Sequence, residues 1–258
     1  MYTAVIVEPR RHPALEFVLR NAVENLSKEW NILVFHGTTN RDFLESIMSA
    51  LPRDRFLSPI PLGMENLTRY DYNALLTSAE FYRAIPTEIH LIFQTDTVIL
   101  SEHRHFLRMF LRYDYVGAPW KNGWVGNGGL SLRNTAKMLK ICEQITPEEV
   151  IHDVVRQVEE QYGTQPAIAE ILESVCRHSK EEGKILNEDI YFSYQRAVPL
   201  SKPDASVAQY FSVESMFCET PWGVHAPWKH LNKSELEPLL KRYPEIRECM
   251  RLNNRRVE

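Results

Sequence analysis

The sequence predicts an α/β fold in which parallel strands are joined by helical crossovers, and two observations indicate this class. Short apolar segments alternate with amphipathic helical segments through the first half of the chain, as they do in βαβ units. With 258 residues, of which 44% are hydrophobic, the chain is long enough to bury a full core. We therefore expect one large domain with a Rossmann-like beginning.

The elements of this half follow in order. A first strand is expected at 2–7, and the helix after it has Pro13 near its start, where proline is well tolerated. The apolar positions of that helix keep helical spacing: Leu15, Val18, Leu19, Ala22, Val23 and Leu26. The remaining expected elements are a strand at 31–35, a helix near 41–50, an extended piece around 55–60, a helix near 71–84, the strand that leads to residue 96 and a helix near 103–112.

An acidic residue, Asp96, ends the apolar strand that starts at His90. Apolar residues resume at Val98, so this carboxylate lies inside a hydrophobic run, where an unpaired charge is costly. Ligands of α/β proteins gather at the carboxyl ends of strands, which makes Asp96 a candidate ligand of a divalent cation that also binds substrate phosphates. The alternative is an Asp that opens a turn and accepts a backbone N–H.

Glycine is concentrated in one short segment, because four of the ten glycines lie between 123 and 129. Glycine is used where the backbone approaches a ligand closely or adopts a positive φ. The segment is therefore either a ligand-binding loop or a Gly-rich hairpin turn flanked by strands.

Residues 147–183 interrupt the alternation with two helical patterns, one through Val150 and Val154 and one through Ile168 and Val175. We interpret this stretch as a helical insertion. A packed appendage is the simplest role for it, and a cover over the site or a partner surface are the alternatives.

Two polar clusters lie near the end of the chain. The carboxylates of Glu188 and Asp189 precede an apolar aromatic segment, which is typical of the first turn of a helix. The segment 221–230 combines one glycine with two prolines, two tryptophans and two histidines. Taken alone, a histidine in such a loop is usually a hydrogen-bonded structural residue, and the tryptophans fit a core.

Composition restricts the partners. A net charge of −4 with a pI near 6.2 provides no general attraction to nucleic acid or to an anionic membrane surface. The sequence contains no apolar leader and no stretch long enough to span a membrane, so we expect a cytoplasmic protein. The four cysteines fit free thiols of a reducing compartment because they are widely spaced and form no CxxC pair: Cys142, Cys176, Cys218 and Cys249.

Several of these segments together resemble a known family. The motifs are Ala4-Val5-Ile6-Val7-Glu8 with Arg10, Trp30-Asn31-Ile32 with the strand to His36-Gly37, Phe93-Gln94-Thr95-Asp96, Tyr115-Val116-Gly117-Ala118-Pro119-Trp120, Gly126-Asn127-Gly128-Gly129-Leu130-Ser131-Leu132-Arg133 and Asn187-Glu188-Asp189. In this order they resemble glycosyltransferases of the type-A (GT-A) fold, and in particular a glycosyltransferase-like domain family of previously unknown function. The resemblance covers most of the chain outside 147–183.

The resemblance implies a mixed sheet flanked by helices in a single GT-A-like catalytic domain over 1–258. Its nucleotide-binding half would be 1–112, and its acceptor and active-site half would comprise 113–146 and 184–258. The helical insertion 147–183 would belong to neither half.

The resemblance also implies a Mn²⁺ or Mg²⁺ ion on the donor diphosphate, held in type-A enzymes by an Asp-any-Asp motif. This sequence has Gln94-Thr95-Asp96 instead, so only Asp96 matches the metal-binding position. His225 matches a late histidine that binds the same metal, with His230 as the alternative. Lys229 would neutralise a phosphate as a point charge. With few carboxylates, the protein alone would bind the ion weakly, and nucleotide phosphates would complete its ligand shell.

The remaining roles follow from the same resemblance. Asp189, with Glu188 as the alternative, would be the general base that takes a proton from an acceptor hydroxyl in an inverting reaction. The residues expected to bind the donor are Val7, Glu8, Arg10, Gly37, Gln94, Thr95, Asn127, Gly128, Gly129 and Lys229. Trp120 and Trp124 would stack on sugar faces.

The predicted activity is thus the transfer of a sugar from a UDP- or GDP-linked donor to a glycan or another hydroxyl acceptor. Two other functions stay open. One is nucleotidyl transfer that makes sugar nucleotides, although the loop after the first strand, 8–13, lacks the glycines that this chemistry usually needs. The other is a non-catalytic module that binds a glycan or a protein. The base, the sugar, the acceptor and the oligomeric state do not follow from the sequence.

Overall fold

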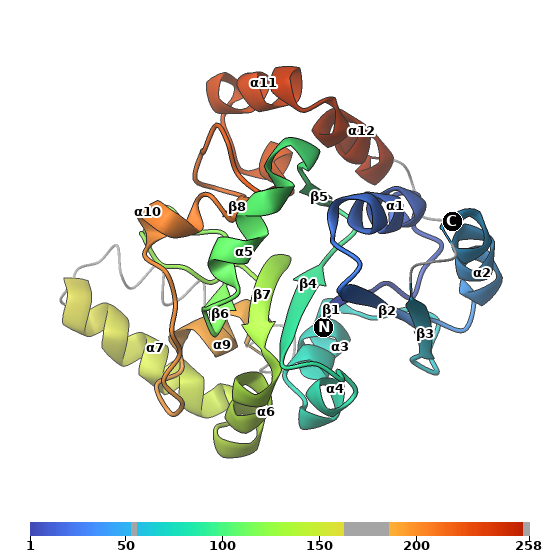
Figure 1. Ribbon diagram of the computed structural model, residues 1–258. Coiled ribbons are helices and arrows are strands. Elements are labelled where there is room, and N and C mark those ends of the chain that lie inside the picture. Colours follow the sequence, from blue (N-terminus) through green and yellow to red (C-terminus); the bar gives the residue numbers. More distant parts are fainter. Residues whose placement is uncertain (53–55, 163–185, 255–258) are drawn as a thin grey trace. The chain divides into compact units, whose positions relative to one another are not determined.

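A computed structural model describes residues 1–52, 56–162 and 186–254 of the chain. The chain divides into two compact units (Figure 1). The larger unit comprises Met1–Asn66, Thr87–Asn134 and Ser201–Glu258, and the smaller unit comprises Leu67–Pro86 and Thr135–Leu200. The predicted division into a nucleotide-binding half, an acceptor half and an insertion stays a prediction.

A six-stranded sheet forms the centre of the larger unit, with the order β3-β2-β1-β4-β7-β6. Its strands are β1 (Tyr2–Val7), β2 (Trp30–His36), β3 (Leu57–Pro61), β4 (Ile89–Phe93), β6 (Tyr115–Val116) and β7 (Leu130–Asn134). The first four pair in parallel, whereas β7 is antiparallel to both β4 and β6. The sheet is therefore mixed, which confirms the predicted fold class.

Helices α1 (Leu15–Asn25) and α2 (Arg41–Ala50) are the crossovers between these parallel strands. The apolar stripe predicted for α1 is buried, from Leu15 to Leu26. It shares one core with every second residue of the strands, for example Ala4 and Ile6 of β1. The buried residues of α1, spaced at helical intervals, thus pack with alternate residues of β1 on one face of the sheet.

Beyond β4 the chain enters a second, three-stranded sheet with the order β5-β9-β8. Its strands are β5 (Thr97–Ile99), β8 (Ser212–Val213) and β9 (Gly223–His225). The predicted strand that leads to Asp96 is β4, and the apolar run that resumes after Asp96 is β5 of the other sheet. Thr97 closes the turn between them, because its backbone N–H donates to the Gln94 carbonyl at 3.2 Å and its hydroxyl accepts from the Gln94 N–H at 2.7 Å.

Short helices complete the larger unit. They are η1 (Ser101–Phe106), α5 (Leu107–Phe110), α10 (Ala205–Ala208), η2 (Pro227–Lys229), α11 (Lys233–Arg242) and α12 (Pro244–Asn253). Both α1 and α12 contact β5. The amide of Asn21 in α1 accepts from the Ile99 N–H at 2.8 Å and donates to the Ile99 carbonyl at 3.0 Å, which satisfies the free edge of β5.

The smaller unit is helical in its described part. Its helices are α3 (Arg69–Leu76), α4 (Ala79–Arg83), α6 (Thr135–Gln144), α7 (Pro147–Tyr162) and α9 (Glu188–Tyr194). The helix predicted near 71–84 is two helices, because Ser78 breaks it and caps α4 by accepting the Phe81 N–H at 3.3 Å. The first helical pattern of the expected insertion is α7, and the second lies outside the described residues.

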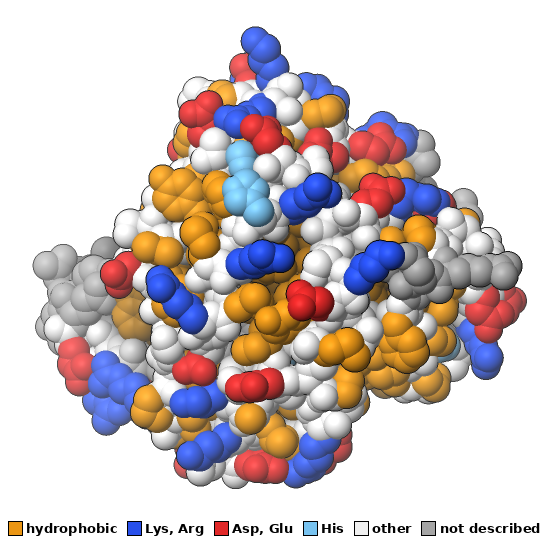
Figure 2. All heavy atoms as spheres, viewed as in Figure 1, with side chains coloured by type: hydrophobic (Ala, Val, Ile, Leu, Met, Phe, Trp, Pro, Cys, Tyr) orange, Lys and Arg blue, Asp and Glu red, His pale blue; other side chains and the backbone are white. Residues whose placement is uncertain are grey.

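Over the described ranges, no helix is long and apolar enough to cross a membrane. On the face drawn in Figure 2, basic and acidic side chains are interspersed with apolar ones rather than gathered by sign.

Candidate functional site

Asp96 lies in the turn between β4 and β5, where the chain passes from one sheet to the other. The residue is buried, with 8% of its surface exposed. Its carbonyl accepts the Ala226 N–H at 2.9 Å, and the neighbouring Thr95 carbonyl accepts the Asn253 side-chain amide at 2.9 Å. The backbone of this turn is therefore held by β9 on one side and by α12 on the other.

Two cationic side chains surround the Asp96 carboxylate. His225 Nε2 lies 3.2 Å from Oδ1, and Lys229 Nζ donates to Oδ2 at 2.8 Å. Burial alone would raise the pKa of Asp96, but the nearby His225 and Lys229 hold it well below its ordinary value. The buried Asp96 carboxylate is thus paired with His225 and Lys229, which lie more than 120 positions further along the chain.

Strand pairing explains how these partners arrive. Thr97 of β5 lies opposite His225 of β9, so His225 stands beside the residue that follows Asp96. After β9 the chain reverses at Ala226, whose φ of 45° is left-handed, and enters η2 with Lys229 at its end. A left-handed alanine costs about 1–2 kcal/mol, so the surrounding packing has to hold this turn.

A second buried carboxylate, Glu214, lies on the other side of the His225 ring. Glu214 is 7% exposed, and its Oε1 lies 3.3 Å from His225 Nδ1 and 3.7 Å from His230 Nε2. The 3.3 Å contact is an ion-pair distance without hydrogen-bond alignment. Although burial lowers the pKa of His225, Asp96 and Glu214 together raise it to about 10, so the imidazole is protonated at neutral pH.

Sequence reasoning missed Glu214, because the strand that it follows has only two residues and was not predicted. Glu214 directly follows the short strand β8, and Asp96 lies three residues after the end of β4. Because β8 runs parallel to β9 with Val213 opposite Val224, the next residues along are Glu214 and His225. The rule that selected Asp96, an acid where a strand ends, also selects Glu214.

The glycine-rich segment packs against this cluster. Asn127 donates its amide to Glu214 Oε1 at 2.7 Å and accepts the Gly129 N–H at 3.2 Å. A Cβ on Gly129 would overlap the His225 ring, and a Cβ on Gly117 would overlap the Asn127 backbone. At these glycines the backbone thus lies directly against the His225 imidazole and against neighbouring backbone. Gly128 is buried, and its carbonyl accepts the Ser131 hydroxyl at 2.9 Å.

Before these glycines the chain forms the hairpin turn that was one of the two interpretations. The Trp120 N–H donates to the Trp124 carbonyl at 2.8 Å, and Gly123 has a φ of 83° in the turn. Trp120 and Trp124 are both half-buried. The hairpin interpretation therefore holds for residues 120–124, and contact of the following glycines with a ligand stays a prediction.

The ends of β1 and β2 carry a separate group of predicted donor-binding residues. Arg10 and Glu8 form a bidentate ion pair, with Nε to Oε1 and Nη2 to Oε2 both at 2.8 Å. Glu8 is 3% exposed, and Val7 before it is also buried. The buried Asn40 side chain donates to the Glu8 carbonyl at 2.8 Å and accepts the Gly37 N–H at 2.9 Å. The two strand ends are thus tied together.

His12 connects this group with the Asp96 cluster. Its Nδ1 accepts the Ala14 N–H at 3.1 Å, so the neutral ring carries its proton on Nε2. Burial lowers the pKa of His12, while the charges of Glu8 and Asp96 raise it in part. The loop after β1 therefore lies within electrostatic reach of Asp96, as the neighbouring ends of the paired strands β1 and β4 require.

Three donor atoms lie close together at Asp96, and their spacing is that of neighbouring ligands on a divalent cation. Asp96 Oδ1 and Gln94 Oε1 each lie 3.2 Å from His225 Nε2. Two ligand atoms at right angles on one ion, each about 2.1 Å from it, lie about 3 Å apart. Among the described residues, however, no group of three or more His, Cys, Asp and Glu side chains is arranged to hold a metal. The protein thus offers the side chains of Asp96 and His225, together with the side-chain amide of Gln94.

The predicted general base lies in the smaller unit. Glu188 and Asp189 form the first turn of α9, the position that favours acids at a helix N-terminus. The Glu188 N–H donates to Asn73 Oδ1 at 2.9 Å, and Asp189 Oδ1 accepts the Ile190 N–H at 2.8 Å. Their role in catalysis stays a prediction.

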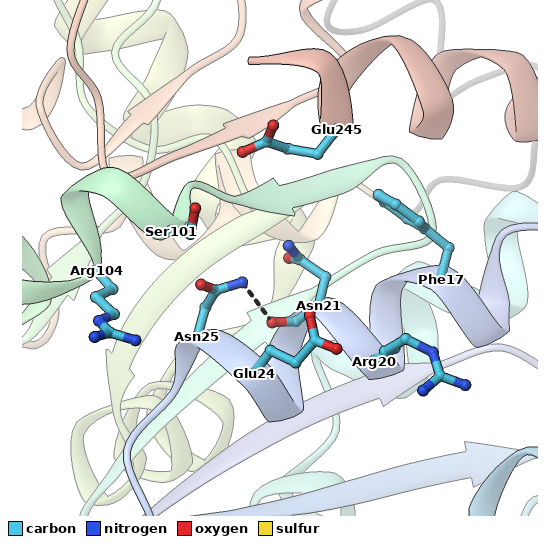
Figure 3. A pocket seen from close by; sticks show the side chains of 8 residues that line it. All are labelled: Phe17, Arg20, Asn21, Glu24, Asn25, Ser101, Arg104 and Glu245. Carbon is cyan, nitrogen blue, oxygen red and sulfur yellow. Dashed lines mark hydrogen bonds between the residues drawn. The ribbon is translucent and has the colours of Figure 1, made fainter. Parts of the chain in front are cut away.

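A cavity of about 370 Å³ lies elsewhere in the larger unit (Figure 3). It is lined by Phe17, Arg20, Asn21, Glu24 and Asn25 of α1, Ser101 and Arg104 of η1, and Glu245 of α12. None of the predicted site residues lines it.

Comparison with known proteins agrees with this architecture. The chain belongs to the family described as "Protein of unknown function (DUF5672)", whose match covers residues 63–225. No curated protein matches the sequence. The fold, however, is shared with solved enzymes.

Among these, the glycosyltransferase GlyE of Streptococcus pneumoniae TIGR4 matches with a TM-score of 0.54 and 10% identity, over 99% of this chain and 62% of GlyE. Its apo form matches with a TM-score of 0.50 and 10% identity, over 99% and 60%. The chain thus spans about three fifths of GlyE. This likeness shows that the fold is of the GT-A type.

Two further structures match over part of the chain. The mannosyltransferase PcManGT from Pyrobaculum calidifontis, in complex with GDP-Man and Mn²⁺, has a TM-score of 0.43 and 13% identity, over 54% of this chain and 46% of that one. The 4-diphosphocytidyl-2C-methyl-D-erythritolsynthase of Anaerococcus prevotii DSM 20548 has a TM-score of 0.41 and 12% identity, over 55% and 74%.

Proposed function

We propose that this protein is a glycosyltransferase that moves a sugar from a nucleotide-diphosphate sugar to an acceptor hydroxyl. The observation that carries the proposal is the convergence of Asp96, Gln94 and His225 on one point at the carboxyl end of β4. Nucleotide ligands of open α/β sheets bind at such strand ends. The GT-A-like fold and the adjacent glycine-rich segment support the same function.

Asp96 and His225 would hold a Mn²⁺ or Mg²⁺ ion, with the amide oxygen of Gln94 as a third ligand. Such an ion, when bound, supplies positive charge that stabilises the departing nucleoside diphosphate. His225 is protonated without the ion, so it has to lose that proton to become a ligand. Because the side chains provide few charges, we expect tight ion binding only together with the donor's phosphates.

The donor would lie along the ends of β1, β2 and β4. Val7, Gly37 and the Glu8–Arg10 pair would contact the nucleoside, and the buried Glu8 orients the guanidinium for that contact. Lys229 holds Asp96, and its half-exposed ammonium would contact the diphosphate as well. The residues proposed to contact the diphosphate or the sugar are Thr95, Asn127, Gly128 and Gly129, and those proposed to stack on sugars are Trp120 and Trp124.

Asp189 would act as the general base, with Glu188 as the alternative. A carboxylate within hydrogen-bond reach of the acceptor hydroxyl takes its proton as the oxygen attacks the anomeric carbon. This reaction inverts the configuration of the sugar and forms no covalent enzyme intermediate. Asp189→Asn should preserve donor binding and abolish transfer, because an amide does not accept that proton.

Calorimetric titration of the protein with UDP- and GDP-sugars, with and without Mn²⁺, tests the proposal. A glycosyltransferase should bind one of the two nucleotide classes more tightly with Mn²⁺ and should slowly hydrolyse the matching sugar nucleotide. Release of pyrophosphate from a nucleoside triphosphate and a sugar phosphate would instead indicate nucleotidyl transfer. Glycan binding with no response to any nucleotide would indicate a non-catalytic module.

A further inference from the structure

One buried oxygen atom connects the histidine of the site with its glycine-rich segment. Glu214 Oε1 accepts the Asn127 amide at 2.7 Å and lies 3.3 Å from His225 Nδ1. These two partners come from different parts of the fold, the segment before β7 and strand β9. The Glu214 side chain is 9% exposed, so it is held by these contacts rather than by water.

We propose that Glu214 is a positioning residue that sets the orientation of His225 and of the glycine-rich segment at the same time. This inference rests on the proposed function, in which His225 and residues 127–129 contact the ion and the donor. A carboxylate beside Nδ1 holds the ring by charge and contact, with Nε2 turned to the proposed position of the ion. His225 Nε2 already points to Asp96 and Gln94.

The connection to Asn127 gives Glu214 a second effect. Asn127 uses its amide nitrogen for Glu214 and its oxygen for the Gly129 N–H, at 3.2 Å. Gly129 in turn lies so close to the His225 ring that it has no room for a Cβ. The four residues therefore form a closed set of contacts, in which a shift of the Glu214 carboxylate displaces both the imidazole and the segment.

Variants at Glu214 separate this positioning role from simple packing. Glu214→Ala removes the shared oxygen, whereas Glu214→Gln keeps an acceptor of the same size without the charge. Glu219→Gln, five residues further along and 72% exposed, is the matched control. The Mn²⁺ affinity is measured by electron paramagnetic resonance and the affinity for UDP and GDP by calorimetry.

We expect Glu214→Ala to weaken Mn²⁺ binding about 10–100-fold, the usual effect of removing a group that orients a metal ligand. Nucleotide binding should weaken with it because the segment is released. Glu214→Gln should fall between Glu214→Ala and the wild type, and Glu219→Gln should equal the wild type. A folded Glu214→Ala variant that binds both ligands like the wild type would overturn the proposal.

A measurement on the metal-free protein keeps the test independent of the proposed function. Two-dimensional ¹H–¹⁵N spectra report the surroundings of the His225 ring and of the backbone amides of Asn127 and Gly129, with the His225 signals identified by their loss in His225→Gln. We expect these signals to move together in Glu214→Ala, to move less in Glu214→Gln and to keep their wild-type positions in Glu219→Gln. If the wild type binds neither Mn²⁺ nor nucleotide, the proposed function fails, and unchanged signals in Glu214→Ala reject the role of Glu214.

Discussion

Two ion pairs lie at the ends of neighbouring strands, and they differ in how they are built. Glu8 and Arg10, after β1, are two residues apart and form a bidentate pair in which the Arg10 side chain is 41% exposed. Asp96, after β4, is paired with His225 and Lys229, more than 120 residues away, and the Asp96 and His225 side chains are only 12% and 11% exposed. The first pair is local and its arginine is partly exposed, whereas Asp96 and His225 are far apart in the sequence and both buried.

The difference determines what each pair contributes. An exposed ion pair is worth about 0–1 kcal/mol, since water screens it and two side chains lose freedom. Breaking a buried pair by removing one partner costs about 3–5 kcal/mol, because an uncompensated charge stays behind. Substitutions in the Asp96 cluster are therefore expected to change both the stability of the larger unit and the proposed metal binding. Substitutions in the Glu8–Arg10 pair are expected mainly to change the proposed contact with the nucleoside.

The largest effect is expected from Asp96→Ala, which removes the acid of the buried pair. We expect Mn²⁺-dependent donor binding to be lost and the unfolding free energy to fall by about 3 kcal/mol, which leaves a typical domain folded. Urea unfolding and calorimetric titration measure the two effects. Asp42→Ala, an exposed acid in the first turn of α2, is the control and should leave donor binding unchanged and lower stability by no more than about 1 kcal/mol. Undiminished Mn²⁺-dependent binding in Asp96→Ala would remove the metal role from this residue.

The next effect is expected from Gly129→Ala, whose methyl group would overlap the His225 ring. Overpacking of this kind costs about 1–3 kcal/mol, and the displaced ring should bind Mn²⁺ less tightly. Gly63→Ala is the comparison, because its Cβ meets open space and only its φ of 73° opposes an alanine. That strain costs about 1–2 kcal/mol and should leave Mn²⁺ affinity unchanged. Equal Mn²⁺ affinities of the two variants would argue against contact between this segment and the ion's site.

A third effect is a dependence on pH that only the buried pair should show. His225 has an ordinary pKa of 6.5 and a folded-state pKa of about 10, so the folded protein binds more protons than the unfolded chain between these values. The stability that the pair contributes is complete below pH 6.5 and should fall by up to about 1.4 kcal/mol per pH unit until pH 10. Mn²⁺ affinity should rise in the same window, since the ion replaces a proton on His225.

Urea unfolding and Mn²⁺ titration from pH 6.5 to 10 follow these two trends. In His225→Gln the contribution of this residue to both slopes should vanish. His105→Gln, an exposed histidine of η1, should keep the slopes of the wild type. Identical slopes in the wild type and His225→Gln would show that His225 does not carry the proton.

The smallest effect is expected from Arg10→Lys at the local pair. Lysine keeps the charge beside Glu8 but loses the two parallel hydrogen bonds, so stability should fall by no more than about 1 kcal/mol. Nucleotide affinity should drop a few-fold, because the donor contact loses its fixed orientation. Calorimetry against UDP and GDP measures it, with Arg41→Lys, a 69% exposed arginine, as control. A loss as large as that of Asp96→Ala would remove the distinction between the two pairs.

Most of the fold was predictable because it depends on periodicity. The apolar stripe of α1 and the alternation of strands with helices define the parallel part of the sheet, and both are visible in short windows of sequence. The exceptions are places where one side chain interrupts a pattern. Thr97 closes the turn that divides the run 90–100 between two sheets, and Ser78 ends one helix and begins another.

The candidate site was predictable only in part. Asp96 and the glycine-rich segment stand out because a carboxylate in an apolar run and a cluster of glycines are locally unusual. His225 entered only through a family resemblance, and Glu214 was missed because β8 is a strand of two residues, too short for a recognisable pattern. Lys229 was expected at a phosphate, which stays a prediction, and its hydrogen bond to Asp96 was not foreseen.

The sequence by itself determined which segments become strands and helices and where acids and glycines stand along them. Only the tertiary structure decided that Asp96, Glu214, His225 and Lys229 meet. Their meeting depends on the pairing of β5 and β8 with β9, in a register that places Thr97 opposite His225 and Val213 opposite Val224. Contacts between residues so far apart follow from strand register and packing, and neither is a property of a local stretch of chain.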